Sequence, residues 1–336
     1  MGKIVNPQIV IVKGGDTPTP PTTGDYFVKV IDFDGTILKS ANLNNGDTFE
    51  LPTPPSHDGL VFQEWSSSQA ITDNKVTINN NNVMIGAVYT TASGLSEFDI
   101  ELTTVTGLSV TLNMDGTKNW GDGKSDTATT HTYSAVGNYT ITCNGTSVSG
   151  DVLGQNSSTP NYTLTKVRLS NSVTSIAGGA FHLCYSLTNI VIPNSVTSFS
   201  DYAPVFNLCY SLTNIIIPSG VTSFHYNDFY KCYSLTNVVI PSGVTSITSG
   251  TFSQCYSLTN IVIPSSVTSI AGISFEQCYS LLEYDFSTFT SVPTLSNTNA
   301  FTDINGICKM KIPSALIDEW KTATNWATYA DYMVAV

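Results

Sequence analysis

A repeat of about 23 residues fills the second half of the chain and restricts the possible folds more than any other feature. Four complete units have 23 residues each, and the second has 25, with its extra residues around Asp201–Pro204. A sixth, degenerate unit begins at Leu281. Repetition at a fixed short period indicates an array in which every unit has the same local structure and stacks on its neighbours. The complete units, aligned on Cys-Tyr-Ser-Leu, are Leu164–Ser186, Leu187–Ser211, Leu212–Ser234, Leu235–Ser257 and Leu258–Ser280.

Apolar residues recur in each unit at positions that one turn of a coil would bury. In the second unit a short strand is expected to end at Pro193, and the chain then returns along the other wall. A single unit cannot bury its apolar side chains, so stability must come from stacking. A period of 20–29 residues with one strand per unit predicts a leucine-rich-repeat solenoid. The residues of the second unit expected inside are Leu187, Ile190, Ile192, Val196, Phe199, Phe206 and Cys209.

Five of the seven cysteines occupy one position in successive units. Adjacent strands are about 4.8 Å apart, so these side chains should stack as a ladder. Parallel Cβ vectors in such a stack do not converge as a disulfide requires. We therefore interpret them as small buried apolar residues, not as metal ligands or disulfides. The ladder consists of Cys184, Cys209, Cys232, Cys255 and Cys278.

The repeat resembles the BspA-like, Treponema-type leucine-rich repeat, through the segments I-P-x-x-V-T-x-I and F-x-x-C over residues 160–302. The resemblance implies adhesion and protein–protein contact. Residues 303–336 are expected to cap the open end of the last coil with one or two short helices that begin after Pro313 and present Trp320, Trp326 and Tyr329.

Two β-rich units and an arm precede the repeats. Residues 1–24 are expected to form an arm and an extended Pro/Thr linker. Residues 25–92 contain F-D-G-T at Phe33–Thr36 and Asp58–Trp65, and they resemble the Listeria–Bacteroides repeat, a small β-grasp-like module. That resemblance implies a hairpin turn at F-D-G-T and a core pair of Phe62 and Trp65.

Residues 93–152 resemble the polycystic-kidney-disease-type (PKD) immunoglobulin-like sandwich, through Trp120-Gly121-Asp122-Gly123, His131-Thr132-Tyr133 and Gly137–Thr142. Asp122 is interpreted as a turn residue in place of a calcium ligand, and His131 as a structural side chain. The expected fold class is mainly β and multidomain: a small β-grasp-like domain, an Ig-like β-sandwich and a leucine-rich-repeat solenoid with a short helical C-terminal cap.

An enzyme is the remote alternative. Asp32-Phe33-Asp34-Gly35-Thr36 resembles the nucleophile motif of haloacid-dehalogenase-type phosphatases, which would make Asp32 the nucleophile, Asp34 the acid/base, and Asp122 or Asp126 a metal ligand. That chemistry requires a doubly wound α/β sheet. No amphipathic helix is apparent between Leu38 and Trp120, so we predict a non-enzymatic protein without a cofactor or metal.

The net charge of −12 argues against nucleic acid and against an anionic membrane surface as partners. No stretch approaches the roughly 18 apolar residues of a membrane span. We therefore expect the solenoid to bind a protein or a glycan on the host surface.

Two parts of the solenoid are candidate binding surfaces. The first is the outward row of the strands, where an Asn row runs beside an apolar stripe. The alternative is that this stripe binds no partner, because it reflects ordinary strand propensity or is covered by another part of the protein. The second is the edge formed by the loops that vary between units. The strand residues are Asn189, Val191, Asn214, Ile216, Asn237, Val239, Asn260 and Val262, and the loop residues are Tyr202, His225, Tyr226, Asp228 and Tyr230.

Two biological settings remain open. The first is a phage virion protein, either a capsid decoration protein or a tail protein. It would attach to other virion proteins through residues 1–24 and display the repeats for receptor binding. The N-terminus lacks the apolar core of a signal peptide, which favours this location in the phage particle. The alternative is an adhesin on the bacterial cell surface or in secreted form, which the set of modules favours.

Overall fold

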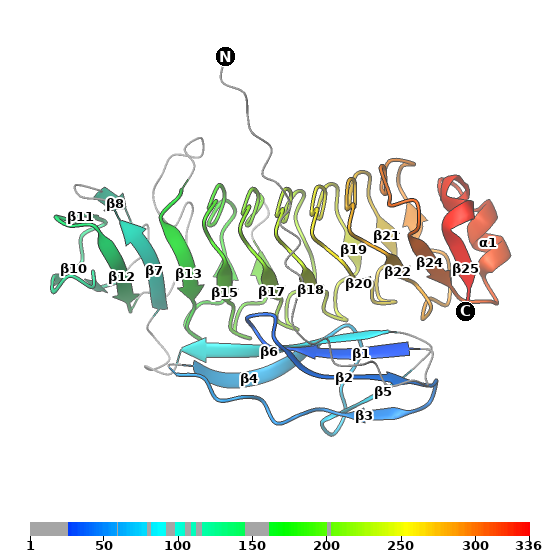
Figure 1. Cartoon of the computed structure of the whole chain (residues 1–336), viewed down its shortest axis with the longest axis horizontal. Helices are drawn as coiled ribbons and strands as arrows, with labels where there is room; N and C mark the ends of the chain where they lie inside the picture. Colours follow the sequence, from blue (N-terminus) through cyan, green and yellow to red (C-terminus); the bar gives the residue numbers. More distant parts are fainter. Residues whose placement is uncertain are drawn as a thin grey trace, which may run out of the picture.

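A computed structural model describes residues 26–58, 60–78, 82–91, 98–104, 109–111, 116–144, 161–199 and 203–336. The chain forms a long solenoid, and the N-terminal β-sheet lies along its strand side (Figure 1). The predicted mainly β class, with a solenoid that ends in a short helical segment, is confirmed. The predicted arm, residues 1–24, lies outside the described residues.

The strand side of the solenoid is built from one short strand per coil. Paired strands run parallel and in register, so that Asn214 faces Asn237 and Ile215 faces Val238. Each side chain therefore lies beside the side chain at the equivalent position of the next unit. The strands are β13 (Leu164–Arg168), β15 (Asn189–Val191), β17 (Asn214–Ile216), β18 (Asn237–Val239), β20 (Ile261–Val262), β22 (Glu283–Asp285), β24 (Lys309–Ile312) and β25 (Met333–Ala335).

The opposite wall carries shorter strands. It includes β14 (Ser175–Ile176), β16 (Ser198–Phe199), β19 (Ser246–Ile247), β21 (Ser269–Ile270) and β23 (Thr294–Leu295), which again pair in parallel where they pair. All residues predicted to lie inside the second unit are at most 3% exposed. The repeat pattern therefore identified the core correctly.

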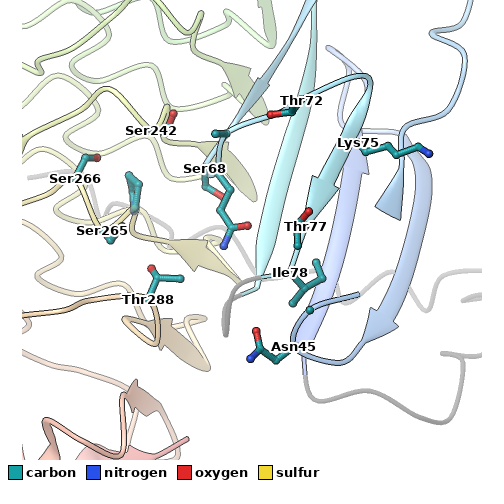
Figure 2. Close-up of a pocket in the computed structure, with 14 residues that line it drawn as sticks. Asn45, Ser68, Thr72, Lys75, Thr77, Ile78, Ser242, Ser265, Ser266 and Thr288 are labelled. Atoms are coloured by element: carbon teal, nitrogen blue, oxygen red, sulfur yellow. The ribbon is translucent and has the colours of Figure 1, made fainter. Parts of the chain in front are cut away.

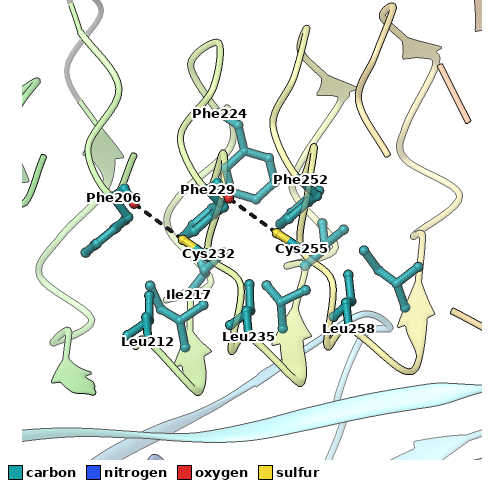
Figure 3. Close-up of a cluster of buried hydrophobic side chains, with 14 of the residues drawn as sticks. Phe206, Leu212, Ile217, Phe224, Phe229, Cys232, Leu235, Phe252, Cys255 and Leu258 are labelled. Atoms are coloured by element: carbon teal, nitrogen blue, oxygen red, sulfur yellow. Dashed lines mark hydrogen bonds between the residues drawn. The ribbon is translucent and has the colours of Figure 1, made fainter. Parts of the chain in front are cut away.

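Phenylalanine rings form a continuous stack through the core (Figure 3). The ring of Phe229 lies 5.4 Å from that of Phe206 and 5.3 Å from that of Phe252, nearly parallel to both. The cysteine ladder lies beside this stack: the Cys232 thiol donates to the Phe206 carbonyl at 3.4 Å, and the Cys255 thiol to the Phe229 carbonyl at 3.3 Å. Each coil is thus joined to the previous one by a ring contact and a thiol hydrogen bond. All seven cysteines are free and buried.

The residue before each ladder cysteine has a left-handed backbone, with φ between 58° and 65°. A second left-handed residue lies two positions before the stacked Phe, as at Asn227 and Gly250. The second unit has Pro204 at this point, and the proline ring restricts φ to about −65°. This is also the unit with two extra residues. The left-handed residues before the cysteines are Leu183, Leu208, Lys231, Gln254 and Gln277.

The C-terminal cap combines strands with helices. Helix α1 (Ile317–Thr322) and the 3-10 helix η1 (Trp326–Tyr332) place Trp320 and Trp326 against the last coil, with their rings 4.5 Å apart. Strands β24 and β25, however, continue the parallel sheet. The strand ladder therefore extends beyond residue 302, where the sequence predicted it to end.

The middle segment closes the other end of the solenoid. It contains β7 (Phe98–Thr104), β8 (Ser109–Thr111), β9 (Lys118–Asn119), β10 (Ser125–Asp126), β11 (Thr130–Thr132) and β12 (Gly137–Cys143). Strand β7 pairs antiparallel with β13, which gives one sheet in the order β10-β9-β12-β7-β13-β15. Trp120 and Tyr133 belong to the same buried cluster as the solenoid core. The segment thus shares its core with the repeats, and its resemblance to a PKD domain stays a prediction.

The N-terminal sheet has the order β2-β1-β6-β4, with β1 and β6 parallel. Its strands are β1 (Tyr26–Ile31), β2 (Ile37–Leu43), β4 (Leu60–Ser67) and β6 (Val83–Thr91), and β3 (Thr48–Glu50) pairs with β5 (Lys75–Thr77). The F-D-G-T segment forms the turn between β1 and β2, and the rings of Phe62 and Trp65 lie 5.0 Å apart. Membership in the Listeria–Bacteroides family stays a prediction.

Strand β6 lies across the solenoid strands (Figure 1). Ile31, Met84 and Val88 pack against the apolar residues of β17, β18 and β20 in one buried cluster. A Cβ atom at Gly86 would lie 2.4 Å from the Ile216 side chain, so the absence of a side chain allows this close approach. The N-terminal sheet is therefore packed on the face of the solenoid.

Candidate functional site

The predicted apolar stripe on the strands is buried under the N-terminal sheet. The exposed fractions of Val191, Ile216, Val239 and Val262 are 2%, 4%, 0% and 1%. Val191 packs with Leu60, Ala87 and Tyr89, and the other three with Ile31, Met84 and Val88. Of the two interpretations that the sequence left open, the structure shows the second, in which another part of the protein covers the stripe.

The Asn row holds the N-terminal sheet in place by hydrogen bonds. Asn189 and Asn214 donate from Nδ2 to the carbonyls of Phe33 and Asp34, both at 2.9 Å. Lys29 Nζ donates to Asn237 Oδ1 at 3.0 Å. Asn260, at the far end of the row, donates to its neighbour Thr259 at 3.2 Å. The expectation that this row faces an outside partner is corrected: its polar groups are used within the chain.

The residues of the phosphatase alternative belong to two separate parts of the chain: Asp32 and Asp34 lie in the turn after β1, whereas Asp122 lies between β9 and β10 and Asp126 lies in β10. Asp32 is buried, and its Oδ2 lies 2.7 Å from His57 Nε2. Asp122 instead pairs with His131 at 2.8 Å. Desolvation alone would raise the pKa of Asp122, but the hydrogen bonds from His131 and from Lys124 N, together with the charges of these two residues, lower it. Asp126 accepts a hydrogen bond from the Trp120 indole at 3.0 Å. Among the described residues, no three His, Cys, Asp or Glu side chains converge to hold a metal ion.

The loop at 225–231 is the most distinctive of the variable loops. Tyr226 is 47% exposed, and its ring lies 4.5 Å from that of His225. Lys231 Nζ lies 5.0 Å from the centre of the Tyr230 ring, a cation–π contact that pairs a charge with an aromatic face. Three aromatic side chains and a cation thus meet on one loop. Tyr202, predicted for the same edge, lies outside the described residues.

Asp228 is a structural residue and not a surface one. It is 0% exposed, and its two carboxylate oxygens accept hydrogen bonds from Val205 N at 2.9 Å and His225 N at 2.7 Å. Burial raises the pKa of this carboxyl group to about 7, against the opposing effect of the two amides. The prediction that Asp228 contacts a partner is therefore corrected, because it joins two neighbouring loops from the inside.

The buried carboxyl group of Asp228 predicts a pH-dependent stability. The folded state keeps the proton up to pH about 7, whereas the unfolded chain loses it near 3.8, so the free energy of unfolding should fall as pH rises between these values. The uncharged variant Asp228→Asn removes this contribution. Urea unfolding at pH 4.5 and 7.5 should show the variant gaining stability relative to wild type at the higher pH, and an unchanged difference would contradict the assignment.

A ladder of tyrosines runs along the solenoid beside the buried cysteines. Successive rings lie 4.1, 4.7, 4.7 and 5.4 Å apart and are stacked. The last ring, Tyr279, is 48% exposed, and the inner ones are half-buried. Burial raises the pKa of Tyr210, Tyr233 and Tyr256, so their hydroxyls stay uncharged. The ladder consists of Tyr185, Tyr210, Tyr233, Tyr256 and Tyr279.

Lys231 connects the loop at 225–231 with this ladder, because Tyr233 N donates to the Lys231 carbonyl at 2.8 Å. We call the five ladder tyrosines together with Tyr230 and Lys231 the tyrosine edge. The ladder was not predicted from the sequence, although a tyrosine follows the cysteine in each of the five complete units. The signal was available: an aromatic residue directly after an inward-pointing cysteine is expected to point outward.

The repeats match one family by sequence. The model for "BspA type Leucine rich repeat region" matches six copies over residues 154–282. This part of the chain is a BspA-type leucine-rich-repeat region. Solenoids of stacked repeats present an extended surface on which other molecules can bind. No curated protein matches the chain.

Solved structures of bacterial leucine-rich-repeat proteins are similar in part. One from Bacteroides ovatus is 25% identical over 43% of this chain, with a TM-score of 0.36, and the match spans only 38% of that protein. The T. pallidum leucine-rich-repeat protein is 24% identical over 51% of this chain and 74% of its own, with a TM-score of 0.33. A leucine-rich cell surface protein from Faecalibacterium prausnitzii is 19% identical over 44% of this chain and 58% of its own, with a TM-score of 0.26.

Helices are few in the described residues, and none of them has the length and apolar character needed to cross a membrane.

Proposed function

We propose that the protein is a non-enzymatic binding protein that contacts a protein partner through the tyrosine edge and the adjoining loop 225–231. One observation carries the proposal: the strand face is occupied by the N-terminal sheet, whereas the tyrosine edge is partly exposed and aromatic. A partner that approaches the solenoid therefore meets the edge and the loops before any strand.

The composition of this edge fits a protein interface. Tyrosine is enriched at interface hot spots because it offers a large contact area and a hydroxyl at a low cost in side-chain entropy. Here the rings are already stacked on one another, so little further ordering is needed on binding. Lys231 adds a cation to the edge of a chain whose net charge is −12, which favours a partner with an acidic patch.

Exchanging the surface of loop 225–231 for that of the next unit tests the proposal. The change His225→Thr, Tyr226→Ser, Tyr230→Ser and Lys231→Gln copies residues 248, 249, 253 and 254, and it leaves the buried Asp228 and Phe229 intact. We expect at least about tenfold weaker binding to intact cells of the organisms that share the gene's habitat, measured by flow cytometry with the labelled chain.

The reverse exchange supplies the matched control. Thr248→His, Ser249→Tyr and Gln254→Lys introduce three of these four residues into the next coil and leave its fully buried Ser253 and Phe252 intact. This variant should keep or increase binding. Equal binding by wild type and by the variant that lacks the loop's aromatic residues would refute the tyrosine edge as the contact surface.

The biological setting belongs to the same proposal. We infer a phage virion protein that attaches through residues 1–24 to other virion proteins and displays the solenoid for receptor binding. The BspA-type match supports the alternative, an adhesin on the bacterial cell surface. Mass spectrometry of purified phage particles and of surface-shaved bacterial cells separates the two, because peptides of the chain should occur in only one of these preparations.

A further inference from the structure

A groove lies where the N-terminal sheet meets the loops of the solenoid (Figure 2). Its volume is about 730 Å³, within the range of small-molecule sites. One wall comes from the β4–β5 region and the turn at Asn45-Gly46, and the other from loops that follow β18, β20 and β22. The groove therefore exists only because the two parts of the chain are packed together. It is lined by Asn45, Gly46, Ser68, Gln69, Ala70, Thr72, Lys75, Thr77, Ile78, Ser242, Pro264, Ser265, Ser266 and Thr288.

The lining is rich in hydrogen-bonding groups and almost free of charge. Nine of its fourteen residues carry a hydroxyl or an amide, and none carries a carboxylate. Lys75 is the single charged residue, and its ammonium group points away from the groove (Figure 2). A neutral ligand is thus favoured over an anion or a cation.

Several of these polar groups are available for a ligand. The side chains of Gln69, Thr77 and Ser265 make no hydrogen bond within the described part of the chain, and in Figure 2 Thr77 and Ser265 lie on opposite sides of the groove. The walls themselves are fixed: Ser242 N donates to the Ser67 carbonyl at 3.1 Å, and Ser266 Oγ to the Val244 carbonyl at 2.6 Å. The two walls are therefore held in place before a ligand binds, which lowers the cost of binding.

We propose that this groove is a binding site for a neutral oligosaccharide. A sugar presents many hydroxyls and no charge, and it needs partners that both donate and accept hydrogen bonds, as amide and hydroxyl side chains do. An apolar ligand would leave these groups without partners, which is costly. The site is separate from the tyrosine edge and does not depend on the function proposed for that edge.

A glycan array tests the proposal with the full-length chain. The array carries neutral oligomers of glucose, mannose, galactose and N-acetylglucosamine together with uronic-acid, sialylated and sulfated oligomers. We expect retention of neutral members only. For the best neutral oligomer, titration calorimetry should give at least about tenfold weaker binding for Gln69→Leu, which removes an amide at nearly constant volume, and for Ser265→Leu, which narrows the groove.

Gln254→Leu is the matched control for Gln69→Leu. It makes the same substitution outside the groove, at a position where Leu183 and Leu208 occur in other units, and it should bind the oligomer as wild type does. Retention of no neutral glycan, retention of acidic glycans only, or binding by both groove variants as strong as that of wild type would overturn the proposal. The loop 225–231 exchange should leave glycan binding unchanged; if it abolishes glycan binding, the sugar binds at the tyrosine edge and the groove assignment fails.

Discussion

Substituting Val239 by aspartate is expected to separate the N-terminal sheet from the solenoid. Val239 is 0% exposed and packs in the cluster that joins strand β6 to the solenoid strands. A carboxylate without a partner in that cluster would cost about 3–5 kcal/mol, so undocking is the less costly response. Hydrogen–deuterium exchange should then rise at β6, β17 and β18, and binding of a hydrophobic dye should increase.

Val61→Asp is the control for this prediction. Val61 lies on β4 of the same N-terminal sheet, but its side chain is 51% exposed, so the same substitution leaves the carboxylate in water. Exchange at β17 and β18 should remain as in wild type. If Val239→Asp also leaves exchange at these strands unchanged, the packing of the sheet on the strand face is incorrect.

Replacing Phe229 by alanine is expected to lower the free energy of unfolding by about 3–5 kcal/mol. The ring is fully buried and lies between the rings of Phe206 and Phe252, so its removal leaves a cavity bordered by two other coils. Neighbouring coils depend on each other for stability, which makes a gap at the centre of the stack costly. Urea unfolding followed by far-UV circular dichroism measures the change.

Tyr226→Ala removes an aromatic ring of similar size three residues earlier, where the side chain is 47% exposed. We expect a loss of less than about 0.5 kcal/mol for this variant. A comparable loss for Tyr226→Ala and Phe229→Ala would show that the phenylalanine stack is not the main source of stability in this coil.

The solenoid and its core could be predicted because the same pattern occurs in every unit. Leu187, Ile190 and Phe206 each have equivalents in the neighbouring coils, and parallel stacking is the arrangement that buries all of them together. The structure adds what the pattern does not contain, namely the hydrogen bonds from Cys209, Cys232, Cys255 and Cys278 to a Phe carbonyl of the preceding coil.

The candidate site was harder to predict for a physical reason. An outward apolar residue such as Val239 indicates that something covers it, but the sequence does not say whether the cover is a partner or another part of the chain. Asp228 shows the same limit, since a carboxylate in a variable loop is usually solvated, and here the Val205 and His225 amides hold it inside. The middle segment contains the Trp120 and Tyr133 of the predicted motif, yet its β7 pairs with the first repeat strand.

The docked N-terminal sheet also limits how the gene can change. Repeat arrays commonly gain or lose whole units by duplication, because each unit contacts only its neighbours. Here Asn189 in β15 binds the carbonyl of Phe33 at 2.9 Å, and Asp285 in β22 accepts from Asn82 N at 3.0 Å, so one rigid sheet is attached near both ends of the array. An inserted unit would shift one attachment by about 4.8 Å relative to the other. The N-terminal sheet thus fixes the number of repeat units between these two contacts. Relatives that keep the sheet should carry the same number of units there.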